Sequence, residues 1–498
     1  MNKTNSMSSK SDFSDKDDAR VCHACIGEEF LKREVRLEGL KRKCGFCGKV
    51  RKSISLGELA DRVQGVIETH FRLTPSDPYS EEYAYDKEVG WERRGEPVEY
   101  LIAEIAGVEQ ELAVAIREIL SERTAWDAHE GGYEDPYGIE AHYEDGKPDT
   151  YDFRESWDFF RRQIKTSERY FGQIAKRALD EIFGDDLDRL KTWLGDRAVR
   201  TIFPESDDRF FYRARIAHSE NELREFLSDP VVKIGPPPFR YAKPGRMNAS
   251  GISVFYGATD IDTCVAETRA PVGSFVVLGR FELIESVRVL DLDLLTNIVA
   301  QGSLFDPEFA THSSRAAFLR HVVDEISRPV MPRDEEFEYL PTQAVSEYLA
   351  SCVEPRLDGI IFHSAQTAGE GRNIVLFHHA AGVEPYELPE GTKVEVHTGW
   401  ASEDDYDDSI AVWETTAASA PEQNPSPDDE NLAYNPVASF APFDIPVMTD
   451  DDYAACRTPH LRLDVQGIEV FRIRAVCYDR SQRSVNRYRR KENENLPF

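Results

Sequence analysis

The segment GRMNASGISVFYGATDIDTCVAETR gathers an arginine, a tyrosine and a glutamate around one short apolar run. Arg246 is followed ten residues later by Tyr256, and Glu267 comes eleven residues after that. A guanidinium can hold a phosphate, an aromatic ring can stack on a flat heterocycle, and a carboxylate can stabilise a cationic sugar. The small residues of GRMNASG would also let backbone amides approach an anion. Together these residue types describe a nucleotide site. The alternative is an ordinary strand flanked by a surface arginine and a helix glutamate paired with Arg269.

Four cysteines near the N-terminus form a second constellation. Cys22, Cys25, Cys44 and Cys47 make two CxxC pairs with eighteen residues between them, the spacing of a four-cysteine zinc site. Four thiolates fill a tetrahedron and leave no position for water, so the predicted Zn²⁺ is structural. The alternative is a set of free or redox-active thiols.

The stretch 32–52 around these cysteines is basic, with nine Lys/Arg against two Glu. Such a stretch either contacts the phosphates of a nucleic acid or is a solvated face drawn to the negative zinc–thiolate centre. We favour the second interpretation, and nucleic acid is not expected as a partner.

Composition sets the broader limits. The chain has 498 residues, 41% of them hydrophobic, and a formal net charge of -31, so we expect several folded domains and no general coating of nucleic acid. The sequence has no run of eighteen apolar residues, so we expect no transmembrane helix. The first twenty residues lack the apolar core of a secretory signal. Cysteines without a disulfide framework favour the cytoplasm.

Helical spacing dominates the first half of the chain. LGELADRVQGVIETHF spaces its apolar residues by three and four, and one longer helix is predicted from Pro97 to Arg123. One or two amphipathic helices are expected between Phe153 and Phe183. The expected organisation is a disordered lead at 1–20, a zinc-binding four-cysteine unit at 21–55 and an all-helical domain at 56–197.

Short β-rich segments alternate with helical ones in residues 198–395, which predicts an α/β domain. An acidic, Pro/Ser-rich stretch follows and predicts a linker at 396–432. Residues 433–498 form a C-terminal segment with two short expected strands. The fold class expected for the whole chain is therefore multidomain α+β.

Three motifs of the α/β domain resemble the RES family. They are FYRAR, GRMNASGISVFYGATDIDTCVAE and DGIIFHSAQTAGEGRNIVLF, and they occur in the family's order. The resemblance implies an ADP-ribosyltransferase-like fold, NAD as the substrate, and a toxin or defence effector that degrades NAD. The N-terminal half is similar to the HEPN-type extension of longer RES proteins.

The resemblance also implies which residues bind NAD. Arg213 of FYRAR would hold its phosphates, although Arg215 is an alternative equivalent, and Arg246 matches the family's second arginine. Tyr256 would flank the nicotinamide, with Tyr212 as a further neighbour of the substrate.

The same resemblance places the catalytic groups on two later motifs. Glu267 would act on the nicotinamide ribose, and Ser364 matches the family serine, with Asn373 close behind it in NAD binding. Arg246 completes the implied catalytic set. His363 stands where the family often has proline, which leaves the local turn geometry open.

The implied reaction cleaves the bond between nicotinamide and ribose. The acceptor is phosphate, water or a protein side chain, and the last would make the chain a mono-ADP-ribosyltransferase. Expected partners are an Xre-type antitoxin or a protein target, and no membrane association is expected.

Two other function classes stay open. One is a binding module with an inactive α/β domain. The other is a HEPN ribonuclease, based only on Arg123 and His129 in an R-x(4–6)-H pattern.

Overall fold

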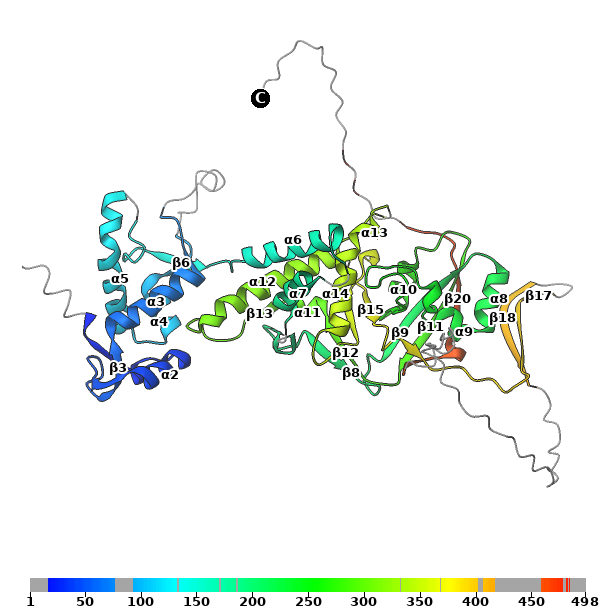
Figure 1. Cartoon of the computed structure of the whole chain (residues 1–498), viewed down its shortest axis with the longest axis horizontal. Coiled ribbons are helices and arrows are strands. Elements are labelled where there is room, and N and C mark those ends of the chain that lie inside the picture. The colour runs from blue at the N-terminus through cyan, green and yellow to red at the C-terminus, as the bar shows by residue number, and fades with distance from the viewer. Residues whose placement is uncertain are drawn as a thin grey trace, which may run out of the picture. The chain divides into compact units, whose positions relative to one another are not determined.

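The computed structural model describes residues 17–483 except 77–92, 132–133, 170–171, 185–186, 332, 368, 402–405, 417–457, 478–480 and 482. The chain forms two compact units (Figure 1). The first unit contains residues up to 200 together with 290–357, and the second contains 201–289 together with residues from 358 onwards. Residues 290–357, which interrupt the sequence of the expected α/β domain, therefore group with the N-terminal half.

The cysteine module, residues 20–55, opens the first unit with a small antiparallel sheet. Its strands β1 (Arg20–Cys22), β3 (Val50–Ser55) and β2 (Leu40–Lys43) lie in that order, beside the short turn η1 (His23–Cys25) and helix α2 (Glu29–Glu38). Helix α3 (Leu56–His70) follows at once, because Ser55 and Glu58 form a capping box at its start. Leu31 and Val35 of α2 share one core with Leu59 and Val63 of α3.

The helix expected from Pro97 is in fact two helices, α4 (Val98–Ala106) and α5 (Gln110–Gly131). Gly107 breaks the run because its φ of 60° is left-handed, a conformation that ends helices. The carbonyl of Gly107 accepts a 2.7 Å hydrogen bond from the Gly27 amide. A Cβ on Gly107 would lie 2.8 Å from the Glu28 nitrogen, so the glycine at the break lets the cysteine module pack closely here.

Residues 56–197 are not an all-helical domain. Strands β4 (Phe71–Leu73), β6 (His142–Asp145) and β5 (Glu96–Pro97) form a three-stranded sheet between the helices. Each strand has only two to four residues, too few to show an alternating pattern in the sequence. The remaining elements of the first unit are α6 (Tyr151–Thr166), α7 (Gln173–Phe183), η3 (Leu187–Arg189), β7 (Lys191–Thr192), α11 (Leu292–Leu295), β13 (Ile298–Val299), α12 (Pro307–Ser327), α13 (Glu335–Glu338) and α14 (Leu340–Ser351).

The second unit is built on a ten-stranded mixed sheet in the order β16-β19-β11-β9-β10-β15-β14-β12-β8, with β20 also paired to β11. The boundary between the two units falls within β8 and β12. The strands are β8 (Val199–Ile202), β9 (Phe210–Ala217), β10 (Phe255–Ala258), β11 (Phe275–Leu283), β12 (Val287–Asp291), β14 (Gly359–His363), β15 (Arg372–Leu376), β16 (Gly382–Val383), β19 (Pro459–Leu463) and β20 (Glu469–Arg472). The core on one face of this sheet includes Phe211, Phe255 and Phe281.

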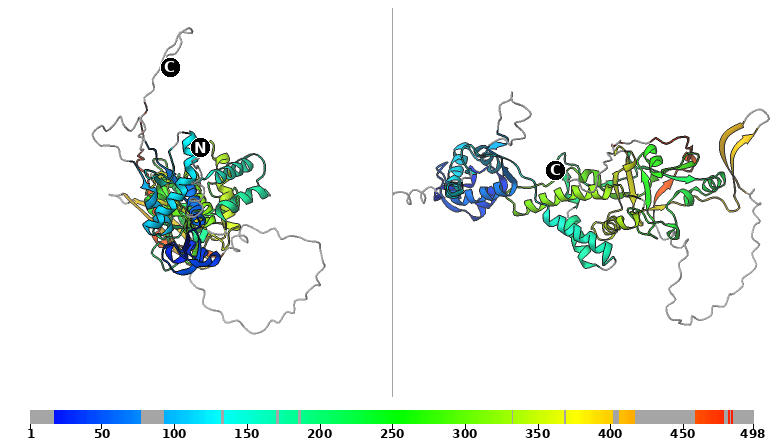
Figure 2. Two further views of the ribbon diagram at one scale, coloured as in Figure 1. Left: turned by 90° about the vertical axis from the view of Figure 1, so that its left-hand side faces the viewer. Right: turned by 90° about the horizontal axis from the view of Figure 1, so that it is seen from above.

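Short helices flank the sheet of the second unit: α8 (Glu220–Ser228), α9 (Pro230–Ile234), η4 (Phe239–Tyr241), α10 (Ile261–Thr268), η5 (Ala365–Thr367) and η6 (Val465–Gly467). Strands β17 (Lys393–Ala401) and β18 (Tyr406–Thr415) form an antiparallel hairpin that begins three residues before the expected linker and continues into it. Figure 2 shows this hairpin as a separate curved ribbon. Arg224 of α8 donates a 2.6 Å hydrogen bond to Thr398 of β17.

Candidate functional site

Strand register places three candidate residues on one face of the sheet. Ala258 of β10 lies opposite Tyr212 of β9 on one side and opposite Asn373 of β15 on the other. Tyr256 is two residues before Ala258, so its side chain points to the same face. Tyr212, Tyr256 and Asn373 therefore share a face, although they come from three separate strands.

Helix α10 lies over this face and carries Glu267. Cys264 of α10 packs with Ala258, Leu278 and Tyr212. Asp260 caps the start of the helix, because its side chain accepts a hydrogen bond from the Thr263 amide. Glu267 lies in the last turn, where the helix dipole disfavours a negative charge, so other groups must hold its carboxylate.

Two side chains hold the carboxylate of Glu267. The buried hydroxyl of Ser364 donates to Oε1 at 2.6 Å, and the amide Nδ2 of Asn373 donates to the same oxygen at 2.7 Å. No hydrogen bond to Oε2 is found among the described residues, and the glutamate is exposed. One oxygen is thus fixed, whereas the other accepts no hydrogen bond from the described residues. No ion pair joins Glu267 to Arg269 in the described structure, unlike the alternative raised from sequence.

The hairpin between β14 and β15 brings Ser364 to the helix. The Ser364 amide donates to the Gly371 carbonyl at 2.7 Å, and the Ser364 hydroxyl accepts a 3.1 Å hydrogen bond from the Gln366 amide. His363 is the last residue of β14 and pairs in register with Arg372. A Cβ on Gly371 would lie 1.8 Å from Oγ1 of Thr263 in α10, so only glycine permits this approach. Sequence reasoning missed both Gly371 and Thr263, because their contact depends on tertiary packing.

Tyr256 closes the turn that contains Arg246. Its hydroxyl donates to Oδ1 of Asn248 at 2.9 Å and accepts from the Met247 amide at 2.9 Å. Gly245 makes room, since a Cβ there would lie 2.7 Å from that hydroxyl. Amides of this loop are therefore partly used inside the protein rather than presented to an anion as expected. Arg246 itself is half-buried on the turn.

Arg213 lies apart from the Glu267 cluster. Neighbouring residues on a strand point to opposite faces, so Arg213 and Arg215 lie on the face of Phe255, away from Tyr212. Arg213 is 7% exposed and donates to the carbonyls of Ile234 at 2.8 Å and Tyr256 at 2.6 Å. Burial, and then the charge of Arg215, lower the pKa of Arg213.

Within the described part of the chain, neither arginine of β9 has a carboxylate partner. Neither forms an ion pair among the described residues, and Nε of Arg215 is buried with no hydrogen-bond partner. A pair of cations in this state has unused capacity for an anion.

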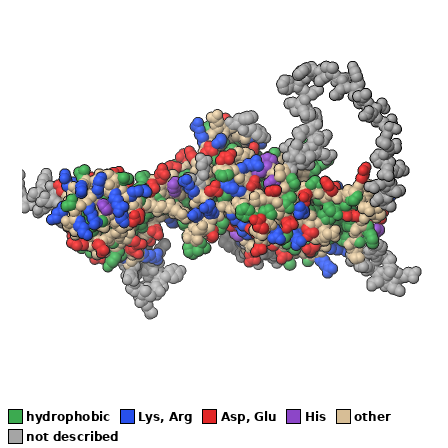
Figure 3. Space-filling view, turned by 90° about the horizontal axis from the view of Figure 1, so that it is seen from below, with side chains coloured by type: hydrophobic (Ala, Val, Ile, Leu, Met, Phe, Trp, Pro, Cys, Tyr) green, Lys and Arg blue, Asp and Glu red, His purple; other side chains and the backbone are tan. Residues whose placement is uncertain are grey.

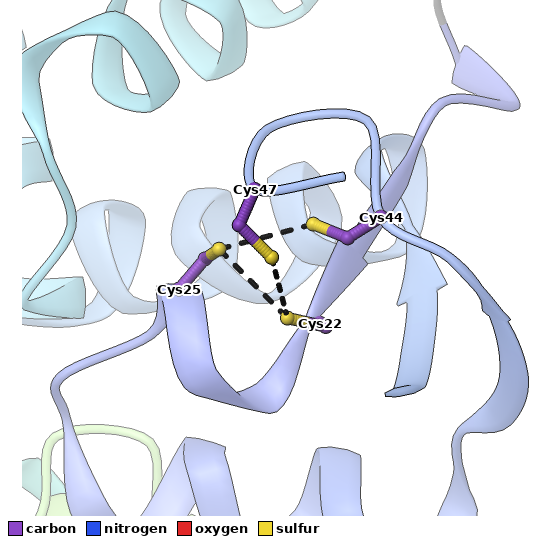
Figure 4. A group of neighbouring side chains, drawn as sticks. All are labelled: Cys22, Cys25, Cys44 and Cys47. Carbon is purple, nitrogen blue, oxygen red and sulfur yellow. Dashed lines mark hydrogen bonds between the residues drawn. The ribbon is translucent and has the colours of Figure 1, made fainter. Parts of the chain in front are cut away.

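The four N-terminal cysteines converge on one point (Figure 4). Their sulfur atoms all lie within 4.8 Å of one another, with separations of 3.8 Å for Cys22–Cys25, 3.6 Å for Cys22–Cys47 and 3.8 Å for Cys25–Cys44. A zinc tetrahedron with bonds of about 2.3 Å has edges of about 3.8 Å. The cluster is therefore a candidate metal site whose spacing fits Zn²⁺.

Of the two residues of the ribonuclease pattern, the structure describes only the side chain of Arg123. Arg123 of α5 forms ion pairs with Asp61 at 2.6 Å and Asp17 at 3.5 Å. The side chain of His129 lies outside the described residues.

Within the described part of the chain, no helix is long and apolar enough to cross a membrane.

Comparison with known families finds a match that covers most strands of the second unit's sheet and also residues 290–357 of the first unit. The family model described as the RES domain matches residues 214–397, less than half of the chain. The chain therefore carries a RES domain, a family generally linked to NAD-degrading toxins. The match begins one residue after Arg213 and contains Arg246, Tyr256, Glu267 and Ser364, as well as Asn373. No curated protein and no solved structure matches the chain.

Proposed function

We propose that the second unit binds NAD and cleaves the bond between nicotinamide and ribose. The observation that carries the proposal is the carboxylate of the exposed Glu267, which Ser364 and Asn373 hold through Oε1, with no hydrogen bond to Oε2 from the described residues. The RES domain match supports NAD as the substrate.

The proposed chemistry is electrostatic. Nicotinamide leaves as a neutral molecule, so the barrier lies in the positive charge that develops on the ribose. A preoriented carboxylate stabilises such an oxocarbenium-like charge, because it needs no rearrangement when the charge appears. Ser364 and Asn373 would keep Glu267 aimed at the sugar. Both act through Oε1, which leaves Oε2 to face the substrate.

The remaining residues would position NAD. The rings of Tyr212 and Tyr256 share the face that α10 lies over, which favours contact with the nicotinamide half. Arg246, on the turn next to Tyr256, would bind the pyrophosphate on this side. The family resemblance assigns phosphate binding to Arg213 as well, which lies with Arg215 on the opposite face of β9 and forms no ion pair with a carboxylate among the described residues.

The acceptor that attacks the ribose is phosphate, water or a protein side chain. The first two make the chain an NAD phosphorylase or glycohydrolase that depletes NAD, as a toxin or defence effector under the control of an Xre-type antitoxin. The third makes it a mono-ADP-ribosyltransferase, and all three use the same Glu267 site.

We also propose that Cys22, Cys25, Cys44 and Cys47 bind one structural Zn²⁺. The sulfur separations support the assignment, and the four ligands leave no open position for catalysis. Bound zinc would link η1 to the β2–β3 turn and so hold the cysteine module together.

The test is nicotinamide release from NAD by the full chain, with and without phosphate. Glu267→Gln is expected to reduce release at least about a hundredfold, because the charge that stabilises the sugar is lost. Asp262→Asn is the matched control, since Asp262 is exposed on the same helix and should leave release unchanged. Equal rates for the two variants would overturn the mechanism. Labelled protein in place of free products would indicate the transferase.

A further inference from the structure

The β2–β3 hairpin of the cysteine module places like charges opposite each other. Lys41 pairs in register with Lys52, and Arg42 pairs with Arg51. All four residues of β2 are exposed. Like charges directly opposite each other destabilise a strand pair, so an anion bound against this hairpin would stabilise it.

No carboxylate of the protein supplies that anion in the described structure. Lys41, Arg42, Lys43, Lys49 and Arg51 form no ion pair among the described residues. The nearby carboxylates of α2 are already engaged, because Glu34 and Glu38 both bind Arg62 of α3, at 3.1 and 2.9 Å.

A zinc–thiolate centre cannot neutralise the whole hairpin. Its net charge of about -2 would act on Lys43 and Lys49, the residues nearest to Cys44 and Cys47 in the chain. Lys41 is three residues from Cys44, roughly 10 Å along an extended strand. That distance is about one Debye length at physiological salt, so exposed charges there are largely screened. The pairs farther along the hairpin keep their positive charge.

The shape of the hairpin indicates which polyanion fits. Strands β2 and β3 contain no aromatic residue on which the bases of a single strand could stack. A two-stranded ribbon fits the major groove of B-form DNA, whereas the major groove of an RNA duplex is deep and narrow.

We propose that the cysteine module docks on the phosphate backbone of duplex DNA through Lys41, Arg42, Lys43, Arg51 and Lys52. Figure 3 shows Lys and Arg side chains gathered over the N-terminal part of the molecule. The chain as a whole carries a net charge of -31, so DNA should be repelled by most of its surface and held only here. This role is additional to NAD cleavage and does not depend on it.

The experiment measures binding of the zinc-loaded full chain to a fluorescent DNA duplex of arbitrary sequence and about two helical turns, by anisotropy at several salt concentrations. The triple variant K41Q/R42Q/K43Q is compared with K147Q/R177Q/K393Q, which removes three exposed cations elsewhere. Because each lost phosphate contact lowers the salt slope by about 0.9, the hairpin variant should lose a slope of about 3 and bind at least about tenfold more weakly at about 0.1 M salt. The control triple should bind as the parent does.

A charge-preserving variant, a zinc measurement and other polyanions complete the experiment. The charge-preserving variant K41R/R42K/K43R should retain binding, and unchanged zinc content of the glutamine variant would show that its module is folded. Tighter binding of single-stranded RNA or duplex RNA than of DNA would overturn the proposal. So would equal losses for the two glutamine triples, or selective binding of polyglutamate, which would indicate an acidic protein partner.

Discussion

The cysteine cluster and the Glu267 cluster are both built from converging polar side chains, but they differ in how the chain assembles them. The four cysteines come from one 26-residue stretch, Cys22–Cys47. Glu267 receives its hydrogen bonds from residues 97 and 106 positions away. The difference extends to chemistry: the cysteine sulfurs all lie close to one another, whereas Oε2 of the exposed Glu267 accepts no hydrogen bond from the described residues. A site whose residues lie close together both in the sequence and in space suits a structural role. A site whose residues come from distant parts of the sequence and leave one oxygen unused suits reaction with a substrate.

Cys44→Ser should produce the largest effect, and it should affect the cysteine module but not the Glu267 cluster. Structural zinc contributes roughly 10 kcal/mol or more to small domains, so the cysteine module should lose its zinc and unfold. Zinc content by mass spectrometry and limited proteolysis measure this. Nicotinamide release should persist, because Glu267 belongs to the other compact unit. Cys352→Ser, an exposed cysteine outside the cluster, is the control. Retained zinc and protease resistance in Cys44→Ser would contradict the assignment.

Gly371→Ala should break the Glu267 cluster without touching a hydrogen-bonding side chain. The added methyl would lie 1.8 Å from Oγ1 of Thr263, so the β14–β15 hairpin must move away from α10 at a cost of about 3 kcal/mol. Thermal unfolding and nicotinamide release should both decline. Adding Thr263→Ala should recover part of both losses, because two of the three clashing atoms disappear. No recovery in the double variant would show that the clash is not the cause.

Ser364→Ala tests the orientation of Glu267 directly. A hydrogen bond to a charged group contributes about 2 kcal/mol, which corresponds to a roughly thirtyfold lower kcat. KM for NAD should change little, since Ser364 is not proposed to touch the substrate before the charge develops. Ser364→Thr keeps the hydroxyl and should retain more activity than the alanine variant. A raised KM with normal kcat would instead place Ser364 in ground-state binding.

Arg269→Gly should have the smallest effect, and a stabilising one. Arg269 ends α10 with a φ of 50°, the left-handed region where a side chain costs roughly 1 kcal/mol. Glycine should therefore raise the free energy of unfolding by about 0.5–1 kcal/mol, measured by thermal or urea denaturation. Arg269→Ala keeps the strain and should not stabilise. Equal stabilisation by both variants would point to charge rather than backbone strain.

Sequence alone predicts most of what depends on local pattern. The expected helix beginning at Leu56 occurs, because the apolar spacing that predicts it acts within a few residues. The break at Gly107 could not be foreseen, since it depends on the packing of Gly27 against it. The acidic stretch that begins near residue 396 was expected to be a linker, yet β17 and β18 pair within it. Pairing between strands can override composition.

The candidate site was predictable as a set of residues but not as a geometry. Motif resemblance named Glu267, Ser364 and Asn373, and the structure places them in hydrogen-bond contact. It could not show that Arg213 and Tyr212, adjacent in one motif, point to opposite faces of β9. That separation follows from strand alternation and from the pairing register of three strands, which only the fold reveals.

The pairing of β19 and β20 with β11 decides how this protein can be divided for biochemistry. Residues Phe275–Leu278 of β11 pair with β20, and Phe281–Leu283 pair with β19. A fragment ending near residue 397, where the RES match ends, would remove both partners and leave a long apolar strand as an unprotected edge. Such an edge is a template for self-association. Any expressed fragment meant to report on NAD chemistry must therefore extend at least through Arg472.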